Sequence, residues 1–348
     1  MKQILGYRGE MVIEELPVPL IGPYDVKIKV FSSVYSAGTE SHRLNGQSKK
    51  SFLTKISSYK AVWGKISRFK IQETLAKYRK FKGYYAQLGY SCYGKVVEVG
   101  CNVEKNIEVG DLVAAGGESA FHASYVSVPQ GLVTKCNGLH SNNFSMVYLA
   151  TIPINSCNQI LKDSPSKVLI VGGGVIGTLA SLYLDTKKVK NMILDPNENC
   201  IFGRNEKKSW LKSHNEITTK YDALLITTGS IQNMDDYYQY LNKEVHVNIL
   251  GEIELNAFTK GQIEELYGKI SFCNSFGYGR RDAELEILNK NIQPRLKTTS
   301  SLNNNVNDAI NFLKNADLRK FTKLHSVEKD LTQIDRNTIN IFEYRDLK

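Results

Sequence analysis

Three closely spaced glycines could let the backbone hold a phosphate group. Gly172, Gly174 and Gly177 have G-x-G-x-x-G spacing, directly follow the apolar run at 168–171 and precede a helical pattern. In such a turn Gly172 permits the bend, Gly174 lets a pyrophosphate approach the backbone, and Gly177 lets the helix pack on the strand. The sequence therefore predicts a dinucleotide-binding turn, with a purely structural strand-to-helix turn as the alternative.

An acidic residue follows the next apolar run, where a ribose-binding carboxylate would lie. Asp195 could accept hydrogen bonds from the adenosine ribose hydroxyls and would repel a 2′-phosphate, which favours NAD over NADP. NADP stays open because three lysines precede the same run: Lys187, Lys188 and Lys190. The other predicted cofactor contacts are residues at the helix N-terminus and after the buried run at 221–226: Val175, Ile176, Thr228 and Gly229.

The composition is that of a folded protein with two domains. The 348 residues, 42% hydrophobic and 23% charged, are enough to build sizeable cores and exclude a disordered chain. No apolar run approaches the roughly 20 residues that a membrane-spanning helix needs, and the start lacks the apolar core of a signal peptide. We therefore expect a cytoplasmic protein without a transmembrane segment. Its six cysteines form no C-x-x-C pair, which indicates free thiols.

The net charge of +10 is concentrated in one segment. Between Lys49 and Lys82 stand eleven basic residues and one acid, so this segment carries the whole excess. Its apolar residues recur at spacings of three and four, which predicts an amphipathic helical insert at 45–85. It could cover the entrance of a cleft, attract an anionic substrate, or adhere to membranes or nucleic acid. Without a motif, we expect no specific nucleic-acid binding.

The rest of the chain predicts an α/β protein with an additional β-rich part. Alternating apolar residues and Gly-Asp turns before residue 135 are typical of a small barrel-like domain, in which 36–46 forms a polar loop. A helix is expected at 141–162, and buried parallel strands at 221–226, at 244–250 and after residue 268. The stretch at 197–221 shows no clear strand. The tail predicts helices at 281–290 and 306–316 and a last strand near 338–344.

Several segments together resemble the medium-chain dehydrogenase/reductase superfamily, the zinc alcohol dehydrogenase-like proteins. They are SAGTESHRLNG, LGYSCYGKVVEVG, VGDLV, HASYVSVP, VGGGVIG and FGYGRRDAELEILNKN. The resemblance covers nearly the whole chain. It implies a GroES-like β-barrel catalytic domain at 1–154 with the insert, a Rossmann domain with a doubly wound parallel sheet at 155–275, and a return segment at 276–348 that completes the catalytic domain.

The zinc ligands of that superfamily are missing from this sequence. The matching positions hold Ala37, Tyr90 and Ile152, and the four-cysteine structural lobe is also missing. Because zinc needs three nitrogen, sulfur or oxygen ligands, we predict no metal. A subgroup with these substitutions and the basic insert resembles the dehydrogenase half of two-part sugar oxidoreductases of polysaccharide biosynthesis. The resemblance implies a sugar-like or nucleotide-sugar substrate, which could be anionic.

Without zinc, side chains must hydrogen-bond the substrate oxygen and carry its proton. The resemblance assigns this chemistry to Thr39, His42 and Tyr90, although Tyr90 could simply fill the space of the zinc and His42 could be structural. Three further residues are candidates for substrate binding: Ser91, Arg280 and Arg281. The same reasoning expects Glu40 to form a structural ion pair and His122 to be a structural residue at a strand end.

The sequence thus predicts a zinc-independent NAD(P)-dependent oxidoreductase that acts on a hydroxyl or carbonyl of a small sugar-like molecule. Two alternatives remain open at this stage. One is a quinone or enone reductase, and the other is a nucleotide-binding pseudoenzyme or partner subunit. A homodimer and a separate partner oxidoreductase are both compatible with the resemblance.

Overall fold

The computed structural model describes most of the chain. The described residues are 1–47, 85–104, 106–136, 141–206, 209–228, 234–250, 257–273, 275–290, 301–327, 334–335 and 337–344. The predicted basic insert lies almost wholly outside them, as does Gly229. Among the described residues, no helix is both long enough and apolar enough to cross a membrane.

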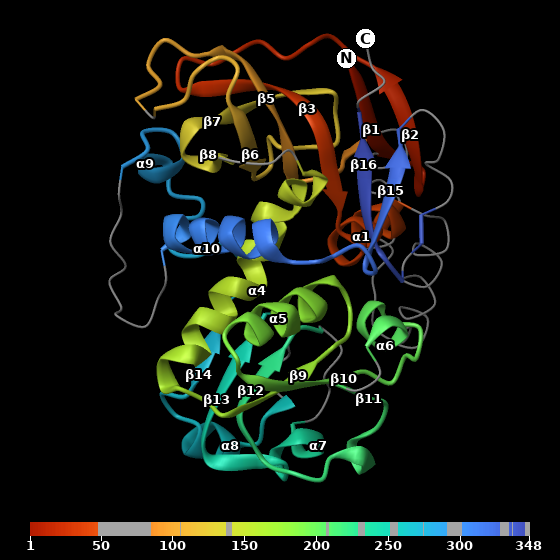
Figure 1. Ribbon diagram of the computed structural model, residues 1–348, viewed down its shortest axis with the longest axis vertical. Helices are drawn as coiled ribbons and strands as arrows, with labels where there is room; N and C mark the ends of the chain where they lie inside the picture. Colours follow the sequence, from red (N-terminus) through yellow and green to blue (C-terminus); the bar gives the residue numbers. More distant parts are fainter. Residues whose placement is uncertain are drawn as a thin grey trace, which may run out of the picture.

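One half of the molecule is built on a six-stranded parallel sheet (Figure 1). Its strands are, in spatial order, β11 (Trp210–Leu211), β10 (Lys190–Leu194), β9 (Lys167–Val171), β12 (Tyr221–Ile226), β13 (Leu241–Ile249) and β14 (Ile270–Phe272). From β9 the chain proceeds outward first to one edge and then to the other, so the direction of winding reverses between β9 and β12. A ligand crevice lies at the carboxyl ends of the strands at such a reversal. The predicted Rossmann sheet is confirmed.

The continuous apolar runs of this sheet reflect burial on both faces. Val168, Ile170 and Leu225 belong to one apolar cluster, whereas Leu169 and Leu224 belong to another. The helices of this half are α4 (Val147–Ile160), α5 (Val175–Thr186), α6 (Ile201–Asn205), α7 (Asp235–Tyr238) and α8 (Lys260–Glu265), with 3₁₀ turns η2 (Asn142–Met146), η3 (Leu161–Asp163) and η5 (His214–Glu216). The predicted helix at 141–162 is therefore present, with 3₁₀ turns at its ends.

The other half is rich in β-structure. One sheet has the order β15-β16-β3-β5-β6-β8, with β7 paired to β3, and a second sheet has the order β2-β1-β4. Their strands are β1 (Lys2–Tyr7), β2 (Glu10–Glu15), β3 (Asp25–Tyr35), β4 (Ala86–Gln87), β5 (Ser91–Val99), β6 (Leu112–Gly116), β7 (Tyr125–Pro129), β8 (Val133–Lys135), β15 (Thr322–Ser326) and β16 (Ile339–Glu343), with the 3₁₀ turn η1 (Gln130–Leu132) before β8. In β3 the predicted alternation is confirmed, because Val26, Ile28 and Val30 are buried.

The C-terminal segment returns to the β-rich half. After α9 (Ala283–Glu286), helix α10 (Leu302–Asn315) packs on α4, and β16 then pairs antiparallel with β3. In Figure 1 the blue strands β15 and β16 accordingly lie in the upper half with the red N-terminal strands. The expected boundary at residue 154 falls inside α4, which belongs to both halves through its packing.

Three local expectations are wrong. The predicted polar loop at 36–46 is helix α1 (Ala37–Gln47), because the Glu40 carboxylate accepts the backbone amide of Ser36 at 2.8 Å and closes the first turn. The helix expected at 281–290 has only the four residues of α9. The stretch at 197–221 contains the two-residue strand β11, which pairs with β10 and completes the sheet.

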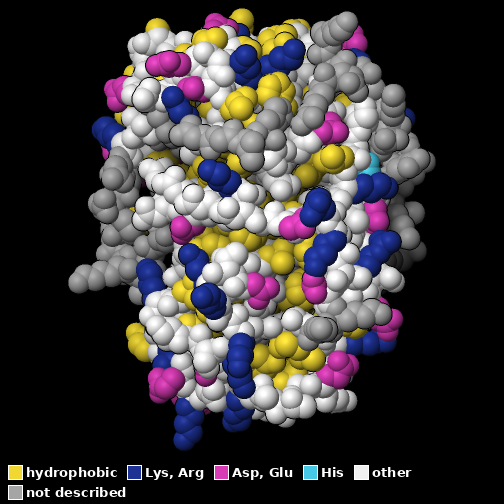
Figure 2. Space-filling view, in the orientation of Figure 1, with side chains coloured by type: hydrophobic (Ala, Val, Ile, Leu, Met, Phe, Trp, Pro, Cys, Tyr) yellow, Lys and Arg dark blue, Asp and Glu magenta, His cyan; other side chains and the backbone are white. Residues whose placement is uncertain are grey.

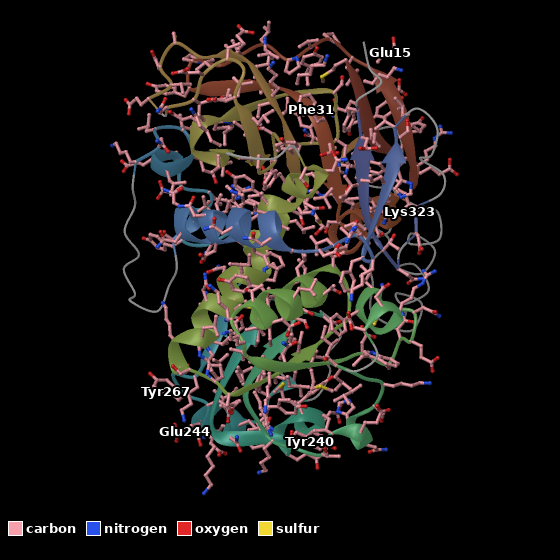
Figure 3. The ribbon with its side chains drawn as sticks, in the orientation of Figure 1. Glu15, Phe31, Tyr240, Glu244, Tyr267 and Lys323 are labelled. Carbon is pink, nitrogen blue, oxygen red and sulfur yellow. The ribbon has the colours of Figure 1, made fainter. Side chains whose placement is uncertain are left out.

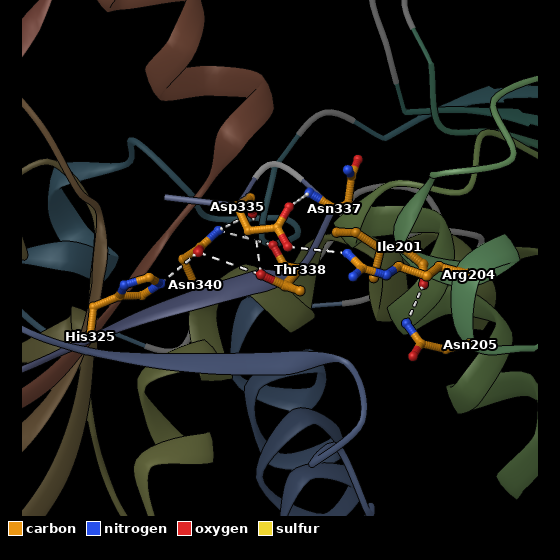
Figure 4. Close-up of polar contacts among 8 residues, drawn as sticks. All are labelled: Ile201, Arg204, Asn205, His325, Asp335, Asn337, Thr338 and Asn340. Carbon is orange, nitrogen blue, oxygen red and sulfur yellow. Dashed lines mark hydrogen bonds and ion pairs between the residues drawn. The ribbon is translucent and has the colours of Figure 1, made fainter. Parts of the chain in front are cut away.

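Polar contacts link the two halves beside α6. The Arg204 guanidinium donates to the Asp335 carboxylate at 3.2 Å, and Lys320 pairs with Glu206. Asn340 ties the segment before β16 together, since its amide donates to the carbonyls of Asp335 and Thr338 (Figure 4). The return segment and the Rossmann half are thus joined by hydrogen bonds as well as by the packing of α10 on α4.

Candidate functional site

The glycine turn after β9 has the geometry that a phosphate-binding loop requires. Gly172 has a φ of 107°, where glycine is favoured, and its amide donates to the carbonyl of Leu194 at 2.9 Å. A Cβ on Gly177 would lie 1.9 Å from the Gly172 carbonyl oxygen, so only glycine allows this approach of helix and turn. A Cβ on Gly174, in contrast, would meet no atom within 4 Å. The backbone at Gly174 therefore borders open space.

Helix α5 begins in that open space. Gly174 is its N-cap and has no side chain that could cap the first-turn amides, which include those of Val175 and Ile176 and have no intrahelical partner. These amides and the positive end of the helix dipole favour an anion. The turn and the helix start thus fit a bound pyrophosphate.

Asp195 lies directly beside this turn. Its carboxylate accepts the amide of Gly173 at 2.7 Å through Oδ2 and the amide of Asn197 at 2.9 Å through Oδ1. These two bonds orient the carboxylate and leave each oxygen a further lone pair for a ribose hydroxyl. Thr228, which follows β12, lies next to the same turn, since a Cβ on Gly172 would be 3.4 Å from Thr228 Cβ.

The lysines considered for an NADP phosphate are too far away. Lys187 is the C-cap of α5 and Lys190 is the first residue of β10, whereas Asp195 follows the last residue of that strand. At about 3.3 Å per residue, the strand separates Lys190 from Asp195 by roughly 16 Å. These lysines instead lie at the amino edge of the sheet, where a cavity of about 370 Å³ is lined by residues that include Lys167, Lys190 and Tyr221. Figure 3 shows that end of the Rossmann half, marked by Tyr240.

In the β-rich half, Tyr90 lies at the centre of a polar and aromatic cluster. Its half-buried ring stacks on Phe276, with 6.4 Å between ring centroids. Burial raises the pKa of the phenol well above its usual range, and the negative charge of Glu40 raises it further, while hydrogen bonds with the Ser36 and Thr39 side chains lower it. The balance keeps Tyr90 protonated at neutral pH, as a hydrogen-bond donor requires.

Helix α1 supplies the groups around this phenol. Thr39 is exposed on its first turn, and Glu40 is fully buried on the adjacent side. Nε2 of the buried His122 lies 2.8 Å from Glu40 Oε2, so the buried partner of Glu40 is His122. His42 is also on α1, but its side chain lies outside the described part of the structure.

The three predicted substrate-binding residues are placed differently from one another. Ser91 is buried, and its hydroxyl donates to the carbonyl of Ser145 at 2.6 Å, so this hydroxyl is bonded within the fold. Arg280 lies over the ring of Phe276, 5.4 Å from its centroid, and pairs with Glu286. Arg281 is exposed, with a left-handed φ of 69°. Of these three residues, only Arg280 therefore contacts a ring that Tyr90 also contacts, that of Phe276.

The positions that match zinc ligands do not form a metal site. Ala37 and Ile152 have no donor atoms, and the protonated Tyr90 phenol is a poor ligand. In the part of the chain that the structure describes, no three or more histidine, cysteine, aspartate or glutamate side chains gather where they could hold a metal ion. The residues present do not fit the zinc of the superfamily.

The sequence reasoning missed Ser36 and Phe276 as parts of this cluster. Ser36 could have been recognised as a helix start from the glutamate four residues later. Phe276 follows the last parallel strand, so it lies next to Tyr90 only through the tertiary fold.

The fold is similar to those of solved alcohol and sugar dehydrogenases. Glucose dehydrogenase of Haloferax mediterranei, in complex with NADP, Zn and gluconolactone, is 14% identical, with a TM-score of 0.65 and 99% of each chain covered. An Escherichia coli structure described as a short chain alcohol dehydrogenase, complexed with NADH, is 16% identical, with a TM-score of 0.66 and 99% of each chain covered. Galactitol-1-phosphate dehydrogenase of Escherichia coli is 14% identical, with a TM-score of 0.66 and coverage of 99% of this chain and 100% of its own.

No family profile and no curated protein sequence matches the chain. At identities this low, the likeness shows the fold. The two-domain α/β fold implied by the resemblance is confirmed.

Proposed function

We propose that this protein is a zinc-independent, NAD-preferring oxidoreductase that transfers hydride between nicotinamide and a hydroxyl or carbonyl of a sugar-like substrate. The observation that carries the proposal is the glycine turn beside Asp195, with open space at Gly174 and the N-terminus of α5 behind it. The dehydrogenases of the same fold support it, because their structures contain NADP or NADH.

The cofactor would be held by this chain at three places. The first-turn amides at Val175 and Ile176 would bind the pyrophosphate, and Asp195 the adenosine ribose. Thr228 would line the crevice at the end of β12, and Gly229 stays a predicted contact outside the described residues. A bound nicotinamide supplies the hydride donor or acceptor at the substrate carbon.

Tyr90 would handle the proton at the substrate oxygen. In the direction of reduction, its hydroxyl donates a hydrogen bond and then the proton to the oxygen that becomes the alcohol. Thr39, whose exposed side chain lowers the pKa of this phenol, would connect it to solvent. The proposal keeps His42 as a further proton carrier on α1.

The hydrogen-bond donors in this site support a reaction that does not need zinc. Where a metal would polarise the substrate oxygen, the chain presents a protonated phenol supported by two hydroxyls. The substrate class is supported by the glucose and galactitol-1-phosphate dehydrogenases of the same fold. Arg281 is the candidate contact for an anionic substrate group, since Arg280 is already paired with Glu286.

A substrate screen tests this proposal. The purified protein is incubated with NAD and a panel of sugars, sugar phosphates, nucleotide sugars and simple alcohols, and with NADH and the corresponding carbonyls, quinones and enones. We expect turnover of at least one sugar-like substrate, and a strong loss of that turnover in Y90F. Reduction of enones or quinones alone would contradict the proposal.

A further inference from the structure

A chain of buried polar side chains lies beneath Tyr90. Glu40, His122 and Ser33 have no exposed surface, and Tyr344 is almost fully buried. Nε2 of His122 is 2.8 Å from Glu40 Oε2, its Nδ1 is 2.8 Å from the Ser33 hydroxyl, and that hydroxyl is 3.2 Å from Tyr344 OH. Four separate segments of the chain therefore meet in one hydrogen-bonded row.

One assignment of hydrogens satisfies every group in this row. The Ser36 amide makes Glu40 Oε1 an acceptor, and His122 Nε2–H donates to Oε2. His122 Nδ1 then accepts from the Ser33 hydroxyl, whose oxygen accepts from Tyr344. With this arrangement the Glu40 carboxylate is buried between the Ser36 amide and the His122 ring.

Such a buried charge is costly for the fold. Desolvating a carboxylate costs several kcal/mol, and apolar residues of similar volume usually stabilise a core as well or better. Stability alone therefore does not account for the pair, which lies at the foot of the candidate site. Buried charges that perturb a neighbouring group are concentrated at functional sites.

The pair flanks Tyr90 through helix α1 and through Gly89. Glu40 accepts the backbone amide of Ser36 at the start of α1. The His122 ring lies against the residue before Tyr90, since a Cβ on Gly89 would be 2.7 Å from His122 Nδ1. Ser36 and Thr39, whose side chains lower the pKa of the Tyr90 phenol, belong to the same turn as Glu40. A change in Glu40 or His122 would therefore shift the turn and the backbone that flank Tyr90.

We propose that Glu40 and His122 are positioning residues for Tyr90, which fix the start of α1 and the backbone at Gly89 so that the phenol points at the substrate oxygen. The catalytic meaning of this inference rests on the proposed function. The positioning itself can be measured without any substrate.

Fluorine NMR of protein labelled with 3-fluorotyrosine tests the positioning directly. The Tyr90 resonance is identified by its loss in Y90F and followed in E40Q and H122Q, which keep the size and hydrogen-bonding capacity of the side chains. We expect both substitutions to move the Tyr90 resonance by more than its line width and to leave that of Tyr183, on α5, in place. An unmoved Tyr90 resonance in folded E40Q and H122Q overturns the inference.

His325 provides the matched control. It is buried and hydrogen-bonded to Asn340, and its ring contacts Phe342, as does that of His122. H325Q should leave the Tyr90 resonance unchanged. If E40Q and H122Q do not fold, S33A carries the same test, because it removes only the hydroxyl that orients His122.

Turnover separates this inference from the proposed function. With the substrate found in the screen, E40Q should lower kcat about tenfold while NADH affinity stays within twofold. A wild-type protein without turnover whose Tyr90 resonance moves in E40Q contradicts the function and supports the positioning. Unchanged kcat in folded E40Q overturns the positioning and leaves the function standing.

Discussion

The carboxylate of Asp195 accepts the backbone amide of Gly173 at 2.7 Å, so the acidic end of β10 and the glycine turn after β9 form one hydrogen-bonded unit. The sheet therefore delivers a negative charge beside the start of α5, where the adenosine ribose of a bound dinucleotide would lie. This relationship is the basis for the proposed preference for NAD.

Replacing Asp195 with serine should change this preference. Loss of hydrogen bonds to a charged acceptor costs about 1.5–3 kcal/mol, so NADH affinity should fall by about tenfold or more. NADPH affinity should rise relative to NADH, since the repulsion of the 2′-phosphate is removed. Fluorescence titration with both cofactors measures the change. K190A, at the far end of β10, serves as the control. If K190A changed NADPH affinity as much as D195S does, the assignment would be contradicted.

Substitutions at two glycines of the turn should affect the stability of the fold and the binding of NADH differently. G177A places a Cβ 1.9 Å from the Gly172 carbonyl oxygen, so it should lower the free energy of unfolding by several kcal/mol. G174A places its Cβ in open space and should cost about 1 kcal/mol or less, but it should weaken NADH binding strongly. Urea unfolding and NADH titration test the pair. Unimpaired NADH binding by G174A would show that the turn is structural only.

The phenol of Tyr90 should matter for turnover and hardly for folding. Y90F keeps the ring that stacks on Phe276 and removes the hydroxyl, so we expect kcat to fall tenfold or more with the melting temperature nearly unchanged. H42Q should lower kcat to a similar degree. Rates are compared on the substrate found in the screen. Unchanged rates in both variants would contradict the proposed roles of Tyr90 and His42.

The buried phenols and thiols should make the protein sensitive to alkali. Burial raises the pKa of Tyr148, Tyr344 and Cys157 above their usual range and raises that of Cys92 to about 12. Above pH 9 to 10 the unfolded chain loses these protons while the folded chain keeps them, so stability falls as pH rises, by about 1.4 kcal/mol per pH unit for each group.

Urea unfolding at several values between pH 8 and pH 11 measures this slope. Y148F should make this slope shallower by the contribution of one group, because a phenylalanine ring at this position has no proton to lose. The hydroxyl of Thr134 can turn to another partner. A stability that is constant or increases across this range would rule out the burial of these groups.

The contacts between the halves should differ in strength. Arg204 and Asp335 are partly exposed, so R204A should lower the free energy of unfolding by less than about 1 kcal/mol. Asn340 is buried and bonds His325 and two carbonyls, so N340A should cost about 2–3 kcal/mol. Chemical unfolding compares the two variants. A larger effect of R204A than of N340A would contradict this ranking.

Much of the Rossmann half could be predicted because its strands are continuous apolar runs and its turn is glycine-rich. The strands β11 and β15 were missed for a physical reason. Trp210 and Leu211 are too few to form a pattern, and β15 is a largely polar edge strand in which Leu324 is half exposed. Neither strand has an apolar pattern from which it could be predicted.

The candidate site was predictable only in part. Asp195 and the glycines could be predicted to lie together because the motif depends on local spacing, and the hydrogen bond from Gly173 to Asp195 joins them. The pairing of His122 with Glu40 joins residues 82 positions apart, and no local pattern specifies such a contact. The same limit explains why Ser91 was expected to bind substrate, since its bond to Ser145 exists only in the folded chain.

The distribution of charged side chains on the surface limits what the net charge of the chain predicts about function. Figure 2 shows lysine and arginine side chains spread over both halves of the visible face and interspersed with acidic ones. The described residues on this face thus form no single basic patch. The three interpretations of the basic insert, which lies outside them, remain predictions.

The central claim is that this fold binds NAD at the glycine turn and works without zinc. The most direct test is a fluorescence titration of the purified protein with NADH and NADPH, with the metal content measured on the same sample. The account predicts tight NADH binding, weaker NADPH binding and less than a stoichiometric amount of zinc. Failure to bind either cofactor, or stoichiometric zinc whose removal abolishes turnover, would contradict it.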